Sequence, residues 1–408
     1  MCLQVHDLCW HVLSTYKEDS NMDEHNGVSR RGFLKLAAGS ALGAAILSVP
    51  ALSLASELTG GATTVKRKLV PVTLKGLPRD AMAAAKASTL VYDSFSSIIS
   101  ISQKISDASL RSAVLKLLND PTPTFMANYP GQSAISRLYS QLASAGLIDT
   151  SKIDVAHLLP PYNGSVQPFR TAPGSGYGSH HSYPGGLATH VGVNMHITSY
   201  ICDTYKEVFG YDVHRDVALA GQAMHDICKP FVFQWQPDGA SLKEYTIAGQ
   251  GAHHVISLAE TIYRGFPPEV VVAQACAHGA PSSPKEEEAV VGWLRAAAMM
   301  AQKDPVDYGL INGMGGLPAP HHQEGYIVHL GDHDWVLSVP AAQKSVVLLK
   351  TIAREKYGMS ESDLNGALFN HFRNYVGAQL SFMFLNFLEA EPSGMEQAYS
   401  QVRRVITQ

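Results

Sequence analysis

Residues 221–230, GQAMHDICKP, end an Ala-rich helical pattern over 215–228. The centre of this segment is the neighbouring pair His225 and Asp226. Inside a regular helix, adjacent side chains diverge by about 100° and do not share a face. At a helix end the geometry relaxes, so both side chains can reach one metal ion, or bridge two.

Other histidines stand at the ends of the neighbouring helical patterns. Nine of the 18 histidines lie between His180 and His278, and they form neither a tag nor a low-complexity tract. The five helical patterns of this region span 187–209, 215–228, 253–263, 268–277 and 285–303. His190 lies in the first, His225 and Asp226 close the second, His253 and His254 open the third, His278 closes the fourth, and Asp304 closes the fifth.

Helical periodicity continues on both sides of this region. The N-terminal patterns cover 79–105, 108–118 and 132–145, and the C-terminal ones cover 341–357, 360–375 and 376–388. The one strand-like signal is a turn at 237–239 flanked by 231–236 and 241–247. The sequence therefore predicts an all-α fold with a small β-hairpin insertion. We expect four regions: a signal segment (1–55), a tether with N-terminal helices (56–170), a metal-binding core (171–310) and a C-terminal helical region (311–408).

The composition excludes several classes of protein. The chain has 408 residues, 46% of them hydrophobic, and a formal net charge of −4. A disordered chain needs low hydrophobicity and high net charge. No basic block is present, which argues against nucleic acid as a partner.

The N-terminal region has the features of an export signal. Arg30 and Arg31 precede Phe33-Leu34-Lys35, and residues 36–55 are uncharged and rich in Gly and Ala. This pattern resembles a twin-arginine (Tat) signal, with small residues at 53–55 before a cleavage site. Met22 would start a segment of conventional signal length. The expectation is export by the Tat translocase to the periplasm or the exterior, with no permanent membrane span elsewhere, although 36–55 is long enough for an anchor.

Imidazole and carboxylate groups on facing helices suit a metal site inside a helical bundle. This mixture of ligands accepts Mn²⁺, Fe²⁺, Zn²⁺, Ni²⁺ or Mg²⁺. A second polar cluster, formed by His329, Asp332, His333 and Asp334, is expected to be an exposed turn. His180 and His181 either line the substrate pocket or cap a loop.

The segments HHSYPGGLATH (180–190), GQAMHDICKP (221–230), GAHHVISLAE (251–260) and AHG (277–279), followed by Asp304, resemble the HD-domain superfamily of metal-dependent phosphohydrolases. The resemblance covers about 175–310 and implies one or two divalent ions. It implies the metal ligands His190, His225, Asp226, His254, His278 and Asp304. His254 is preferred over His253, and Cys228 departs from the glycine usual in the family.

By the same resemblance, Asp226 would bridge two ions, and Lys229 would face the phosphate of a small anionic substrate. His181 is a further candidate for substrate binding. The predicted function is hydrolysis of a small phosphate ester or nucleotide-like anion. Two alternatives stay open: a di-iron oxygenase with the same ligand set, and a non-catalytic domain that binds a metal or ligand.

Overall fold

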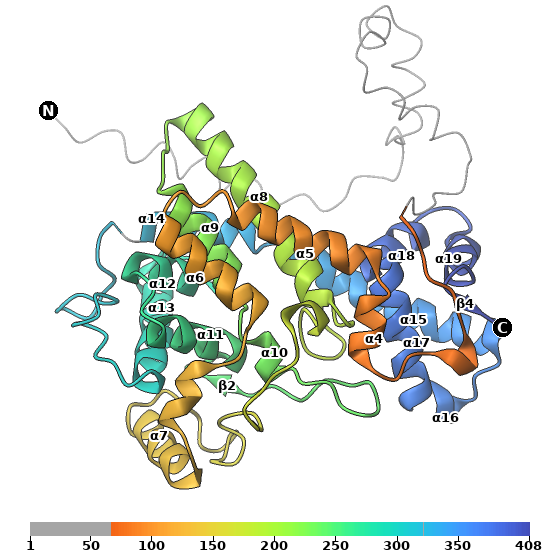
Figure 1. Ribbon diagram of the computed structural model, residues 1–408, viewed down its shortest axis with the longest axis horizontal. Helices are drawn as coiled ribbons and strands as arrows, with labels where there is room; N and C mark the ends of the chain where they lie inside the picture. Colours follow the sequence, from red (N-terminus) through yellow and green to blue (C-terminus); the bar gives the residue numbers. More distant parts are fainter. Residues whose placement is uncertain (1–66, 321) are drawn as a thin grey trace, which may run out of the picture. The chain divides into compact units, whose positions relative to one another are not determined.

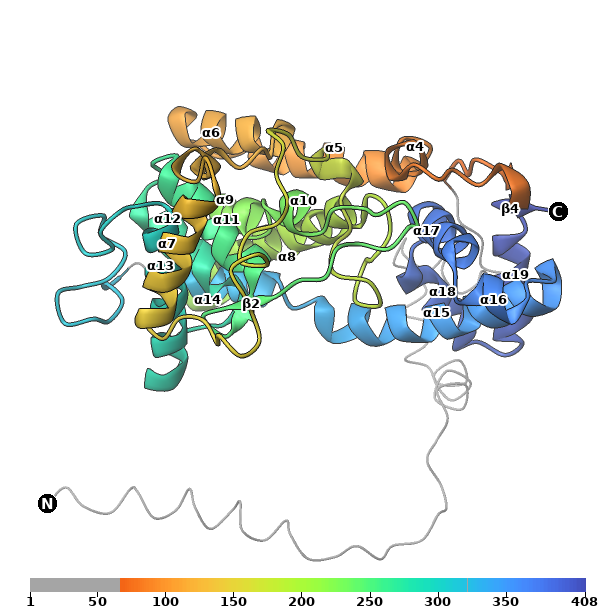
Figure 2. The same ribbon diagram turned by 90° about the horizontal axis from the view of Figure 1, so that it is seen from below.

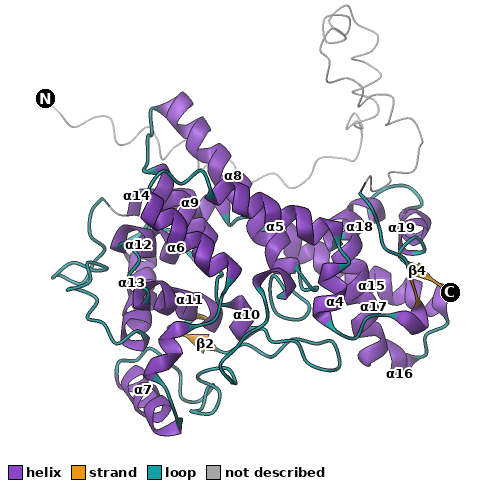
Figure 3. Cartoon of the chain, in the orientation of Figure 1, coloured by secondary structure: helices purple, strands orange, loops and turns teal. Residues whose placement is uncertain are grey.

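Helices dominate residues 67–320 and 322–408, which are the residues described by the computed structural model (Figure 3). The predicted all-α fold is confirmed. Within these residues the named strands are two short pairs. The predicted signal segment, residues 1–55 with Met22, lies outside the described residues.

The N-terminal helices cover one side of the central ones. They are α4 (Ala81–Lys86), α5 (Thr89–Ser102), α6 (Ala108–Asn119) and α7 (Gln132–Ser144). The helix predicted over 79–105 is divided into two because Ser88 caps α5, where its hydroxyl oxygen accepts a hydrogen bond from the Val91 N–H at 3.0 Å. Helix α5 lies along α8 (Gly186–Phe209), as Figure 1 shows.

The central helices carry most of the histidines. They are α8, α9 (Arg215–Met224), α10 (Lys229–Val232), α11 (Ala252–Tyr263), α12 (Pro268–Ala275) and α13 (Pro284–Met300), with a 3-10 turn at Cys276–His278. Helix α9 packs on α12, and α11 packs on α13. These helices share one apolar core with α5, α6 and α7, in which Ile98, Leu219 and Leu258 are fully buried.

The C-terminal helices are α14 (His322–Gly331), α15 (Trp335–Tyr357), α16 (Glu361–Leu364), α17 (Ala367–Leu380), α18 (Phe382–Glu389) and α19 (Gly394–Val402). Those from α15 onward build a second apolar cluster, whereas Ile327 and Val328 of α14 belong to the first. Helix α14 packs on α8, α9 and α12, whereas α15 extends to α18, which places α15 beside the C-terminal helices (Figure 2). The sequence predicted α15 only from residue 341 and did not predict α14 or α19.

The small strands differ from the predicted hairpin. Strands β2 (Thr246–Ile247) and β3 (Gln250–Gly251) are antiparallel, and β1 (Val72–Thr73) pairs in parallel with β4 (Ile406–Thr407). The turn at 237–239 forms, but only a single bridge joins Trp235 and Ser241 beside it. The first predicted strand fails because its start, residues 231–232, belongs to helix α10.

One helical run in the described residues, His322–Tyr357, is long and apolar enough to cross a membrane by length and composition alone. The sequence pattern predicts no such stretch outside 36–55. In its most apolar window 44% of residues are buried inside the protein, and a core helix passes the same test. This run includes the turn between α14 and α15, which carries Asp332 and Asp334.

Candidate metal centre

Close backbone approaches bring the polar side chains together. At Gly186, the first residue of α8, an added Cβ would lie 1.6 Å from the His181 carbonyl oxygen. At Gly331, the last residue of α14, it would lie 2.0 Å from Thr198 Oγ1. Only glycine permits such approaches. The first places the loop before α8 over that helix, and the second brings the end of α14, and hence Asp332, against α8.

Four side chains converge in a first group: His190 from α8, His225 and Asp226 after α9, and Asp332 after α14. Asp226 Oδ2 lies 3.2 Å from His190 Nε2 and 3.1 Å from His225 Nε2. Asp332 Oδ1 lies 3.2 Å from each of the same two nitrogens. Neighbouring ligands at about 2.1 Å from one ion stand about 3 Å apart, so this spacing fits a single cation.

A second group begins at the other oxygen of Asp226. Asp226 Oδ1 lies 3.4 Å from His253 Nε2, at the start of α11, and 3.8 Å from His278 Nε2. His278 Nε2 also lies 3.5 Å from Asp332 Oδ2. Asp226 and Asp332 thus each direct one oxygen to either group. We call His190, His225, Asp226, His253, His278 and Asp332 the His/Asp cluster.

Unused polar atoms indicate that these groups could hold metal ions. Asp226 is fully buried, and its Oδ1 accepts no hydrogen bond. His253 Nε2 also lacks a hydrogen-bond partner. Lys229 pairs with Asp226 Oδ2, but Oδ1 has only imidazole nitrogens at 3.4 and 3.8 Å. A buried carboxylate is costly unless its oxygens have partners, and metal coordination is one way to supply them. The nitrogen and oxygen donors suit divalent cations, and they lie within 4.8 Å of one another in three triads: His190, His225 and Asp226; His225, His278 and Asp332; and Asp226, His253 and His278.

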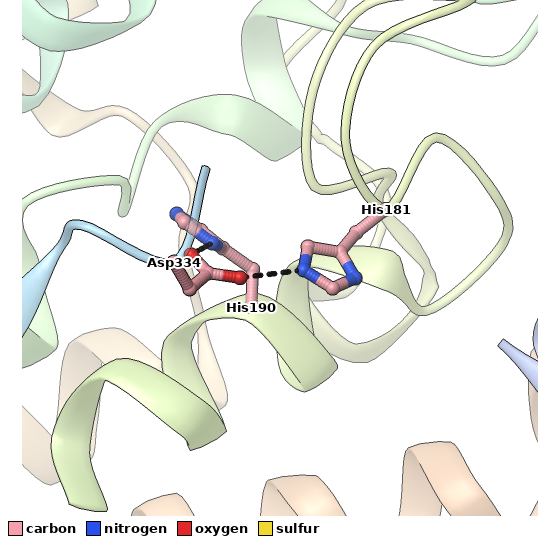
Figure 4. Close-up of side chains that lie close together, drawn as sticks. All are labelled: His181, His190 and Asp334. Carbon is pink, nitrogen blue, oxygen red and sulfur yellow. Dashed lines mark hydrogen bonds and ion pairs between the residues drawn. The ribbon is translucent and has the colours of Figure 1, made fainter. Parts of the chain in front are cut away.

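Asp334, a carboxylate outside the His/Asp cluster, contacts the Nδ1 side of the His190 ring. Figure 4 shows Asp334 between two imidazoles. Asp334 Oδ1 lies 3.1 Å from His190 Nδ1, and Asp334 Oδ2 lies 2.8 Å from His181 Nε2. Burial raises the pKa of Asp334, but His190 and His181 outweigh burial and hold that pKa well below its usual range. An ionised Asp334 favours a proton on Nδ1 of His190. Burial lowers the pKa of this ring, but Asp334, with Asp226 and Asp332, outweighs burial and raises that pKa well above its usual value. A metal would replace the proton on Nε2, while Asp334 orients the ring through Nδ1.

Lys229 lies against the cluster and is buried. Its Nζ is 2.5 Å from Asp226 Oδ2 and also donates to the Gly174 carbonyl. Burial alone raises the pKa of Asp226, but His225 and Lys229 hold this pKa well below its usual range. The structure thus places the lysine beside the carboxylate shared by both groups.

Two predicted ligands lie elsewhere. Asp304 is exposed, and its carboxylate accepts hydrogen bonds from the N–H groups of Val306 (2.8 Å) and Asp307 (2.9 Å). His254 donates from Nε2 to the Ala275 carbonyl at 3.1 Å. Burial lowers the pKa of His254 to about 3, so this ring is neutral. The structure turns His253 toward Asp226 and puts Asp332 in the place expected for Asp304.

Asp332 and Asp334 are the residues that sequence reasoning missed. They were expected in an exposed turn, but Asp332 is 3% exposed. The available signal was the density of acidic and histidine side chains at 329–334, within a run apolar enough to be buried. Carboxylates are rarely buried unless they are paired or bind a cation.

One relative is known from comparison with curated proteins. The chain is 30% identical over 196 residues to a dihydroneopterin 2',3'-cyclic phosphate phosphodiesterase of Methanocaldococcus jannaschii. The aligned part covers 48% of this chain and 64% of the relative, so less than two thirds of the relative's length is spanned. No family model matches the chain, and no solved structure matches it.

Proposed function

We propose that the protein is a metal-dependent phosphohydrolase that acts on a small phosphate ester. The observation that carries this proposal is the Asp226 carboxylate, which is buried between two sets of donors, with Oδ2 paired to Lys229 and Oδ1 not hydrogen-bonded. His190 and His225 with Asp332 would hold one ion, and His253 with His278 would hold a second. At such a site divalent ions supply activation of water and neutralisation of charge on phosphoryl oxygens.

The residues of the chain have separate tasks in this proposal. Asp226 bridges both sets of donors and fixes their separation. Lys229 stands at Asp226 as a compact positive charge that can turn toward a phosphate oxygen. Asp334 contacts Nδ1 of His190, so Nε2 is the nitrogen that faces the His/Asp cluster, where a metal would replace its proton. Burial keeps the pKa of His278 well below its usual value, so His278 is neutral and able to coordinate.

The relative supports a substrate class. That protein is a phosphodiesterase of a 2',3'-cyclic phosphate, which is a small cyclic phosphodiester. We propose a substrate of this class here, with membership of the HD-type phosphohydrolases. No observation in the described residues favours the di-iron oxygenase over hydrolysis.

Export by the Tat translocase is part of the proposal. It rests on Arg30, Arg31 and the uncharged run 36–55. N-terminal sequencing of protein recovered from the periplasm or medium is expected to find a start near residue 56. Recovery of the full-length chain in the cytoplasm alone would contradict export.

The central test combines elemental analysis with an assay. The full-length protein is expected to contain one or two divalent ions and to hydrolyse 2',3'-cyclic AMP, with activity lost on chelation and restored by Mn²⁺, Fe²⁺, Zn²⁺, Ni²⁺ or Mg²⁺. The His225→Ala variant should lose metal and turnover together, whereas His196→Ala, which alters a histidine of α8 outside the cluster, should keep both. Turnover in a metal-free sample would overturn the proposal. Bound iron with an absorption change under O₂, and no hydrolysis, would favour the oxygenase.

A further inference from the structure

Arg373 on α17 is a buried cation without an anionic partner. The residue is 0% exposed, and no carboxylate of the described residues forms an ion pair with it. Its Nη2 donates to the carbonyl oxygen of Ser182 at 3.1 Å and to the hydroxyl of Ser182 at 2.7 Å. Its Nε and Nη1 have no acceptor. A guanidinium stays charged in proteins, so this position carries an uncompensated buried charge.

A second arginine of the same chain, Arg264, has its charge compensated by a carboxylate. Arg264 donates from Nε to Glu260 Oε1 at 2.5 Å and from Nη2 to the Thr122 carbonyl at 3.1 Å. Its charge is neutralised within the protein. Arg373 instead faces Ser182 and the rings of Tyr177 and Phe382, none of which carries a negative charge. Its charge can therefore pair with an anion from outside.

The surroundings of Arg373 connect it to the His/Asp cluster and to solvent. Ser182 directly follows His181, which is held by Asp334 behind His190. On another side, the ring of Tyr177 lies 4.3 Å from the Arg373 guanidinium carbon. Tyr177 is 46% exposed and stands between Gly176 and Gly178 in the same loop. The Tyr177 hydroxyl donates to Asn370 Oδ1 on α17, and the Phe382 ring covers another side of the guanidinium. Release of that hydrogen bond and a turn of Tyr177 would uncover the Tyr177 side of the guanidinium.

We propose that Arg373 and Ser182 form a binding site for a phosphate group, with Tyr177 as its cover. Arginine binds phosphate through several charge-assisted hydrogen bonds, and Nε and Nη1 are unused donors of that kind. The assignment of this phosphate to the substrate or product rests on the proposed function. The anion site itself depends only on the residues around Arg373.

The test measures binding of inorganic phosphate to the full-length protein, as purified and after chelation of metals. Phosphate is expected to raise the melting temperature of the chelated wild type. Arg373→Met should abolish this rise or weaken the apparent phosphate affinity at least about tenfold, since charge-assisted hydrogen bonds are lost. Arg373→Lys keeps the charge without the planar group and should show a weaker response than wild type.

The control is Arg354→Met, because Arg354 is exposed and already paired with Glu361 at 2.7 Å. This variant should respond to phosphate as wild type does. Without phosphate, Arg373→Met should melt at or above the wild-type temperature, because an unpaired buried charge is removed. The deciding quantity is the rise in melting temperature that phosphate causes. If this rise is absent in chelated wild type, or unchanged in both Arg373 variants, the inference is overturned. Hydrolysis that persists in that case would leave the proposed function intact.

Discussion

Asp226 and Glu260 are two fully buried carboxylates whose surroundings differ. Glu260, on α11, accepts hydrogen bonds from the Thr124 hydroxyl at 2.8 Å and the Phe125 N–H at 3.0 Å, and it pairs with Arg264. Asp226 pairs with Lys229 through Oδ2 at 2.5 Å, and its other neighbours are imidazole nitrogens at 3.1 Å or more, with Oδ1 not hydrogen-bonded. A buried carboxylate whose oxygens are both used by hydrogen bonds stabilises the fold, whereas one with an oxygen left free can bind a ligand.

The largest effect is expected for Asp226→Asn, which tests whether Asp226 binds metal. The substitution keeps the shape but removes the charge shared by both groups of donors. We expect loss of bound metal and a fall in kcat/KM of about 10³-fold or more, because metal ions contribute several kcal/mol to charge stabilisation in such reactions. Elemental analysis and hydrolysis of 2',3'-cyclic AMP measure both. Full metal content in the variant would contradict the bridging role.

Glu260→Ala tests the other side of the comparison. Breaking a buried ion pair leaves Arg264 uncompensated and is expected to cost about 3–5 kcal/mol of unfolding free energy, measured by urea denaturation. Metal content and kcat, measured at a temperature where the variant is folded, should match wild type. Loss of metal from the folded variant would show that the two carboxylates are not separate in function.

Asp334→Asn tests whether the carboxylate that contacts His190 Nδ1 positions this imidazole for metal binding. Loss of such an outer partner typically weakens metal affinity about 10–100-fold, and calorimetric titration with Mn²⁺ measures the change. Asp334→Glu should recover part of the affinity. A matched control is Asp154→Asn, since Asp154 forms a similar contact with His157 at 2.7 Å on the surface. An equal effect of both Asn variants would argue against positioning by Asp334.

The pH dependence of metal binding follows from His225. Burial lowers its pKa, but Asp226 and Asp332 outweigh burial and raise it to about 9 in the metal-free protein. At His190 too, burial lowers the pKa, but Asp334, Asp226 and Asp332 outweigh burial and raise it. A metal must displace these protons, so below pH 9 the affinity should fall at least about tenfold for each pH unit. Calorimetry in two buffers of different ionisation enthalpy should detect at least one proton released per ion. An affinity that does not change between pH 6 and pH 8 would contradict this assignment.

The sequence predicted the helical class because apolar periodicity is a local property. Which of several neighbouring polar residues faces the His/Asp cluster depends on non-local packing. Whether His253 or His254 faces Asp226 is set by the rotation of α11, and the sequence does not fix that rotation. Helix α14 was missed although Gly331 packs it against Thr198 and delivers Asp332 to the cluster. The unpaired state of Arg373 is likewise visible only once α17 and Ser182 are in contact.

The smallest effect is expected for Asp304→Asn, and its comparison with Asp332→Asn tests which of the two aspartates is a metal ligand. Asp304→Asn alters an exposed side chain that accepts hydrogen bonds only from backbone N–H groups within three residues. Such a local hydrogen bond is worth about 1 kcal/mol at most, so metal content and activity should equal those of wild type. Asp332→Asn, at a buried carboxylate between His190 and His225, should lose metal. If Asp304→Asn loses metal while Asp332→Asn keeps it, the His/Asp cluster is not the metal centre.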